Sequence, residues 1–154
     1  MDFTFQVLKN IRGIFNRIIE ENSSEVLNKI PSGFNNNIIW NIGHVVVSEQ
    51  LLAYKLSGLE TNLSETMINK YKKDSKPEGI VSEEEVHEIK SLLLATVERT
   101  KQDYEKGVFK SYNTYTVSTT GNTLNNIDEA LHFILAHEGI HYGYVLALLK
   151  AIKN

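Results

Sequence analysis

Two histidines with a carboxylate between them lie near the end of the sequence, in His137-Glu138-Gly139-Ile140-His141. Residues four apart on a helix differ by about 40° in direction, so both imidazole rings can face the same ion. Bonds of roughly 2.0–2.1 Å between a metal and a ring nitrogen are within reach of such a pair. The spacing therefore predicts that His137 and His141 bind one metal ion together.

The match to the HExxH motif of metalloproteases ends with these five residues. Those enzymes take their third ligand from a later element or from an extension of the motif. Residues 142–154 contain no His, Asp, Glu or Cys. A further protein ligand must come from upstream, which argues against a protease of this type.

Three upstream histidines are candidates for the third ligand. His132 lies about 140° from His137 around the helix and opposite His141, so it cannot join their site. His87 stands in the polar opening turns of a helix, where a solvated side chain is expected. His44 falls within an apolar stripe at helical spacing. We interpret His44 as the third ligand.

Glu138 falls near the middle of the inward face when the last helix is drawn on a wheel. Burial disfavours an ionised carboxylate, so a Glu in the core needs a partner. Its role stays open between a general base, a group that orients the ligands, and an occasional ligand. The alternative is that Glu138 and the histidines form only a buried polar network.

The donor set limits the metal. Three neutral imidazoles suit zinc, nickel or another late divalent ion, and three protein ligands leave positions open for water, a thiol or a substrate. The chain has no cysteine, which excludes a thiolate site and disulfides. These features favour a reactive metal site.

Composition excludes several classes of protein. The 154 residues suffice for a single domain, which we expect to span 1–154. An apolar fraction of 42% and a net charge of −3 indicate a globular protein without the basic surface that nucleic acid needs. No apolar run approaches the eighteen residues of a membrane span. We expect a cytoplasmic protein with no nucleic-acid or membrane partner.

Helical periodicity predicts an all-α four-helix bundle. The first helix places Arg12 away from its apolar set, which comprises Phe3, Val7, Ile11, Ile14, Phe15, Ile18 and Ile19. A long polar connection, 58–80, indicates a crossover between the second and third helices or a lid, and 111–121 reads as extended or loop-like. The four helices are expected at about 3–22, 36–56, 82–106 and 127–152.

The last helix is apolar around most of its circumference. Phe133, Ile140, Tyr144 and Ala147 lie away from its main apolar stripe. A helix with two apolar faces usually contacts a partner on each. This pattern predicts a homodimer.

Two motifs resemble those of the DinB-like (YfiT-related) superfamily of metal-binding four-helix bundles. They are Trp40-Asn41-Ile42-Gly43-His44 and the closing HEGIH followed by Tyr and Gly143. The resemblance covers nearly the whole chain. It includes residues 73–77 of the crossover, residues 82–84 after it, and the segment 119–121 before the last helix.

The resemblance implies an up-down-down-up topology, a dimer, and a three-histidine metal site that maps onto His44, His137 and His141. Some similar proteins are transferases or isomerases that use bacillithiol or mycothiol, and others resemble hydrolases. The resemblance therefore implies a low-molecular-weight thiol as a candidate cofactor beside the metal.

The leading hypothesis is a metal-dependent enzyme that acts on a small molecule by thiol transfer or hydrolysis. One alternative is a sensing or ligand-binding protein whose metal captures a small acid or thiol without turnover. Another is a structural dimer stapled by a metal, with Glu138 as a fourth ligand.

Overall fold

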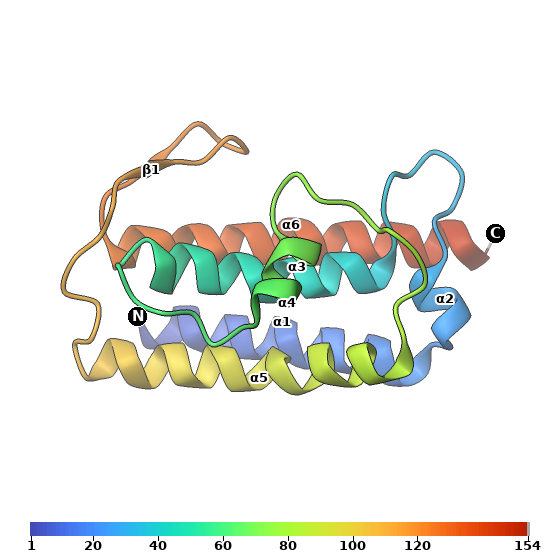
Figure 1. Ribbon diagram of the computed structural model, residues 1–154, viewed down its shortest axis with the longest axis horizontal. Helices are drawn as coiled ribbons and strands as arrows, with labels where there is room; N and C mark the ends of the chain where they lie inside the picture. Colours follow the sequence, from blue (N-terminus) through green and yellow to red (C-terminus); the bar gives the residue numbers. More distant parts are fainter. Residues whose placement is uncertain (154) are drawn as a thin grey trace.

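The computed structural model describes residues 1–153, which form an all-α four-helix bundle (Figure 1). Its long helices are α1 (Asp2–Glu21), α3 (Ile38–Gln50), α5 (Glu83–Glu105) and α6 (Ile127–Lys153). A π-helical turn, η1 (Leu51–Lys55), continues α3. All four predicted helices are confirmed, with ends within about two residues of those expected except where η1 replaces the last turns of the second.

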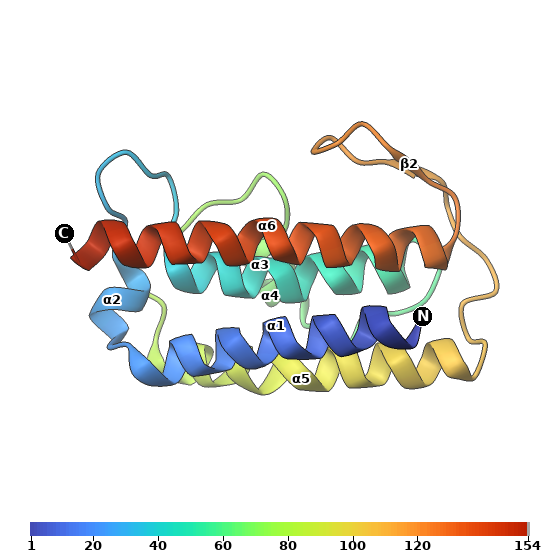
Figure 2. The same cartoon turned by 180° about the vertical axis from the view of Figure 1, so that it is seen from behind.

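The bundle has two layers. α1 and α5 form one layer and α3 and α6 the other, and α6 packs against both α1 and α3 (Figures 1 and 2). α1 and α6 run in one direction, whereas α3 and α5 run in the other (Figure 1). The order is therefore up-down-down-up, as the resemblance implies. α3 and α6 are consequently antiparallel neighbours, which is the pair that carries the three candidate ligands.

The buried face of α1 includes the predicted Phe15, Ile18 and Ile19 but differs from the prediction nearer the N-terminus. Phe3 is 75% exposed, whereas Phe5 and Leu8 are buried. The buried face also includes Arg12, which has no exposed surface. The prediction that Arg12 lies apart from the inward face was wrong, because position 12 keeps the three- and four-residue spacing of its buried neighbours despite its charge.

α3 is the central helix of the fold. All of its residues except Ser48 are buried. The side chain of Asn37 accepts a hydrogen bond from the backbone N–H of Trp40 at 2.9 Å and so caps the helix N-terminus. A helix enclosed on nearly every side needs cover from more than the three other long helices.

Two short helices supply that cover, and neither was predicted. α2 (Ser24–Asn28) and α4 (Glu65–Tyr71) both pack against α3. α4 lies inside the long crossover, where the Ser64 hydroxyl accepts from the N–H of Met67 at 3.1 Å and caps it. The crossover then returns the chain to Ser82, which caps α5 by accepting from the N–H of Glu85 at 3.3 Å.

A small hairpin precedes α6. β1 (Tyr115–Thr116) pairs antiparallel with β2 (Thr123–Leu124). The stretch 111–121, predicted as extended or loop-like, thus supplies the first strand of a hairpin. The hairpin projects from the bundle on the same side as the connection between α4 and α5 (Figure 1). Asn126 then starts α6 by accepting from the N–H of Glu129 at 2.9 Å. Among the described residues, no helix combines the length and apolarity that crossing a membrane requires.

Candidate metal centre

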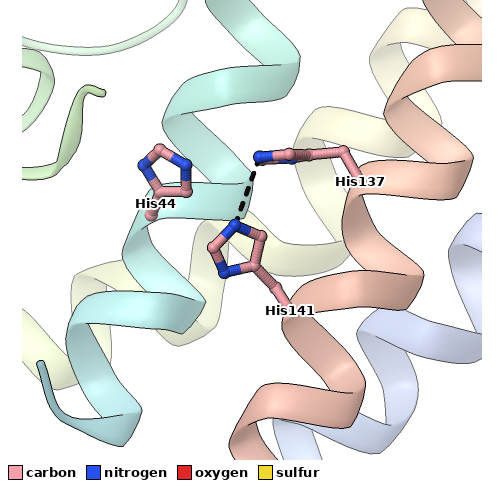
Figure 3. A group of neighbouring side chains, drawn as sticks. All are labelled: His44, His137 and His141. Atoms are coloured by element: carbon pink, nitrogen blue, oxygen red, sulfur yellow. Dashed lines mark hydrogen bonds between the residues drawn. The ribbon is translucent and has the colours of Figure 1, made fainter. Parts of the chain in front are cut away.

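The three predicted ligands come together between α3 and α6 (Figure 3). One ring nitrogen from each of His44, His137 and His141 lies within 4.8 Å of the other two. The Nε2 atoms of His137 and His141 are 3.2 Å apart. The two other predicted candidates, His87 and His132, are exposed and lie outside this cluster.

The orientation of His44 is fixed from both sides of its ring. Its Nδ1 lies 2.7 Å from the carbonyl oxygen of Tyr71, and since a carbonyl only accepts, Nδ1 carries the proton and donates. The indole of Trp40 stacks on the ring with centroids 4.8 Å apart and an interplanar angle of 11°. Nε2 is left unprotonated in the neutral ring, and the Ser48 hydroxyl lies 3.2 Å from it.

Gly43 allows the Tyr71 carbonyl to reach His44. A Cβ atom at position 43 would lie only 2.6 Å from Cδ1 of the Tyr71 ring. That separation is far below a van der Waals contact, so only glycine lets the buried end of α4 approach α3 this closely. The Gly-His pair of the sequence motif therefore has a physical reason: the glycine admits the residue that orients the histidine.

His141 is oriented by a side chain of α3. Its Nδ1 lies 2.8 Å from Oδ1 of Asn41. The amide nitrogen of Asn41 donates to the backbone oxygen of Asn37 at 2.7 Å and to Oδ1 of Asn36 at 3.1 Å. These bonds leave Oδ1 of Asn41 as the acceptor for His141. Nδ1 of His141 is thus the protonated nitrogen, and its Nε2 has a free lone pair facing His137.

The arrangement fits a metal ion. Two nitrogens at roughly 2.05 Å from a tetrahedral ion would be roughly 3.3 Å apart, and the Nε2 atoms of His137 and His141 already have nearly that separation. Hydrogen bonds from the far nitrogens of ligating histidines to oxygen acceptors are typical of metal sites. His44 and His141 both have such bonds.

Burial keeps the three rings neutral. Burial first, and then the neighbouring histidines, lower the pKa of His137 to about 4 and that of His141 to about 3. Burial likewise lowers the pKa of His44, although the hydrogen bond to the Tyr71 carbonyl opposes the shift. Metal binding requires neutral imidazole. The site is therefore in its binding form at neutral pH.

Glu138 lies outside this cluster and pairs with Arg12. Its two carboxylate oxygens accept from Nε of Arg12 at 2.8 Å and from Nη2 at 2.6 Å. Neither side chain has exposed surface. The partner that a buried Glu138 requires is therefore a guanidinium from α1.

Arg12 connects all four long helices. Besides Glu138 of α6, it donates to the carbonyl oxygen of Val45 on α3 at 3.2 Å and to that of Leu93 on α5 at 3.4 Å. Glu49 adds a second carboxylate 3.9 Å from Nη2. Burial acts to lower the pKa of Arg12, but the carboxylates of Glu138 and Glu49 outweigh it and raise that pKa. Burial raises the pKa of Glu138 against the opposing effect of the guanidinium.

A cavity of about 360 Å³ opens beside the histidines and includes all three in its lining. Its other walls come from the end of α3 with η1, from the hairpin, and from α6, with apolar side chains such as Leu52, Val117 and Phe133. This volume is within the range of small-molecule sites. A ligand in the cavity would have direct access to the metal position.

Comparison with known protein families finds a match over most of the chain. The model of the DinB superfamily matches residues 8–145, a span that contains the three histidines, Arg12 and Asn41. No curated protein matches the chain.

Proposed function

The chain belongs to the DinB superfamily, and from that premise we propose that it is a metal-dependent enzyme acting on a small molecule at an open three-histidine site. The observation that carries the proposal is the convergence of His44, His137 and His141 beside a cavity. Because the rings are neutral and two have their far nitrogens bonded to oxygen acceptors, zinc or nickel is the expected ion.

We propose that Glu138 positions the histidines and does not act as the base. Its carboxylate bonds twice to Arg12, it has no exposed surface, and it does not line the cavity. A base must reach the proton that it removes, and Glu138 has no such access. The same pairing speaks against Glu138 as a fourth ligand in a purely structural site.

Thiol transfer is the favoured reaction. A divalent ion bound by the histidines would supply Lewis acidity and stabilise a thiolate or hydroxide. In thiol transfer, the sulfur forms a bond to an electrophilic carbon as the bond from that carbon to the leaving group breaks. The leaving group departs with the electron pair, and the proton of the thiol passes to solvent or to the leaving group. No Asp or Glu lines the cavity, and a metal-bound thiol needs no such base to ionise.

The lack of a carboxylate in the cavity also favours a second function, binding or sensing without turnover. A metal with three histidine ligands could capture a thiol or a small acid and hold it in the apolar cavity. Tight binding of a thiol without its consumption, across a panel of electrophiles and esters, would support this function over catalysis.

The first test is elemental analysis of untagged protein purified without chelator, beside the variant His44→Ala. We expect about one zinc or nickel ion per chain, lost in the variant. Fluorescence of Trp40, the only tryptophan, gives a second readout because its indole stacks on His44, and added Ni²⁺ should quench it. Wild-type protein that binds no metal in either measurement would refute the proposal.

We further propose that the protein is a homodimer through α6. Ile140 and Leu146 of this helix are 51% and 44% exposed, which leaves apolar surface on α6 that a second copy of the chain would cover. Light scattering of wild type and Leu146→Glu tests it, with Leu94→Glu on α5, whose side chain is also 44% exposed, as the control. A monomeric wild type would contradict the proposal.

A further inference from the structure

The charged residues of the cavity beside the histidines are both lysines. Lys55, from η1, and Lys73, from the connection after α4, line it, and no Asp or Glu does. The chain as a whole has a net charge of −3. The cavity lining is therefore positively charged, whereas the chain as a whole is negatively charged.

Both ammonium groups are available to a ligand. Lys55 has no salt-bridge partner within residues 1–153. Nζ of Lys73 lies 3.8 Å from Oδ2 of its sequence neighbour Asp74, and the two side chains are 56% and 85% exposed. An exposed pair at that distance contributes little energy. The ligand would compete with water and with this one weak contact.

The rest of the lining defines what lies between the lysines and the metal position. Leu51, Leu52 and Phe133 contribute apolar surface, and the hydroxyls of Ser118 and Thr119 come from the hairpin. The cavity volume of about 360 Å³ admits one small organic molecule. Such a site combines a metal, an apolar wall and positive charge.

We propose that the cavity binds a small organic anion with an apolar body, whose donor atom faces the three histidines and whose carboxylate or similar anionic group pairs with Lys55 and Lys73. The inference rests on the proposed function, since it takes the histidines as a metal site. It adds the charge class of the substrate, which metal chemistry alone leaves open.

Two thiols that differ at one end provide the probe. We would titrate zinc-loaded protein with 6-mercaptohexanoate and with 6-mercaptohexan-1-ol in a calorimeter. The thiol and the aliphatic chain are the same, so the difference in affinity reports the carboxylate. We expect the acid to bind about 3- to 10-fold more tightly, the size expected for two partly exposed ion pairs. The preference should shrink as ionic strength rises.

The variant Lys55→Met/Lys73→Met should bind both thiols with the affinity of wild type for the alcohol, with its zinc content unchanged. Lys106→Met/Lys150→Met is the matched control, because it removes the same charge at exposed positions outside the cavity. The control should retain the preference for the acid.

The possible outcomes distinguish the proposed metal site from the proposed anion site. Wild type without zinc, or zinc protein that binds neither thiol, refutes the open metal site of the proposed function. Equal binding of both thiols overturns the anion inference and leaves the metal site standing. A preference for the acid that survives Lys55→Met/Lys73→Met also overturns the inference, because the carboxylate would then be recognised elsewhere.

Discussion

Arg12 on α1 holds the carboxylate of Glu138 on α6 through two hydrogen bonds, at 2.8 and 2.6 Å, in the fully buried centre of the bundle. Glu138 directly follows His137, and the Arg12 guanidinium also bonds to the carbonyl oxygen of Val45, the residue after His44. One side chain thus fixes α6 and α3 relative to each other next to the histidines. These hydrogen bonds of Arg12 therefore help to set the distance between His44 on α3 and His137 on α6.

Removal of either partner should destabilise the protein strongly. Arg12→Met leaves the Glu138 carboxylate buried without its guanidinium, and Glu138→Leu leaves the guanidinium with only Glu49, 3.9 Å from Nη2. Unpaired buried charges of this kind typically cost about 3–5 kcal/mol. We expect each single variant to lose roughly that much free energy of unfolding in urea denaturation of the metal-free protein. A loss below about 1 kcal/mol would contradict the pairing.

The double variant Arg12→Met/Glu138→Leu separates stability from positioning. Replacement of a buried ion pair by apolar side chains is often neutral for stability, so part of the loss should be recovered. The buried carboxylate of Glu49, 3.9 Å from Nη2 of Arg12, also loses its cation and limits the recovery. Zinc affinity, measured by competition with a chelator, should nevertheless stay about 10- to 100-fold below that of wild type, by analogy with groups that orient metal ligands. Wild-type affinity in a stable double variant would show that the pair has only a structural role.

Asn41 should govern metal affinity more than stability. Asn41→Ala removes the acceptor for Nδ1–H of His141, so the ring is free to rotate or change tautomer. We expect zinc affinity to fall about 10- to 100-fold. Asn28→Ala is the control, because Asn28 joins α2 to Val81 by two hydrogen bonds away from the histidines. It should lower the melting temperature without a change in zinc affinity, and equal losses of affinity in both variants would contradict the role of Asn41.

Local periodicity predicted the four long helices, and the spacing of the histidines predicted which three would lie together. These features depend on residues close in sequence or on the repeat of a helix. Arg12 shows where this reasoning fails. Its spacing from Leu8 and Phe15 is that of a buried position, but a charged residue was assigned to the surface because its partner, Glu138, is 126 residues away.

The acceptor for His44 was also beyond sequence reasoning. It is a backbone carbonyl, that of Tyr71, and no side-chain pattern encodes it. α4, which supplies it, lies within the polar stretch 58–80, which indicated only a crossover or a lid. Asn41 belongs to the motif that ends at His44, yet its pairing with His141 depends on how α3 and α6 pack. Long-range geometry, not composition, determines these contacts.

Gly43→Ala should damage the site through Tyr71. The new methyl group would lie 2.6–2.9 Å from three atoms of a fully buried ring whose hydroxyl is bonded to Glu85. Overpacking of a core typically costs about 1–3 kcal/mol, and displacement of Tyr71 would remove the acceptor for His44. We expect lower stability and weaker zinc binding in the same variant.

Gly13→Ala is the matched control for this substitution. Position 13 is also helical, but nothing lies within 4 Å of an added Cβ. Alanine is a better helix former than glycine by about 0.5–1 kcal/mol, so this variant should be more stable than wild type, with unchanged zinc affinity. A Gly43→Ala protein that behaves like Gly13→Ala would contradict the close approach of α4.

The metal-free protein should become less stable as the pH falls below about 6.5. In the unfolded chain His137 and His141 take up protons near the ordinary pKa of about 6.5, whereas in the folded protein their pKa values are about 4 and about 3. Between these limits the unfolded state binds more protons, so stability rises with pH. At pH 5 the two histidines together should contribute a slope of at most about 2.7 kcal/mol per pH unit.

Urea denaturation of metal-free protein at several pH values between 4 and 8 measures this slope. The carboxylates titrate in the lower part of this range, so wild type must be compared with His137→Asn/His141→Asn, which keeps all of them. Because asparagine does not titrate, the variant should lose less stability than wild type between pH 6.5 and pH 5. If the free energy of unfolding fell equally with pH in both proteins, the two imidazoles would protonate as freely in the folded protein as in the unfolded chain. That result would contradict the lowered pKa values of His137 and His141.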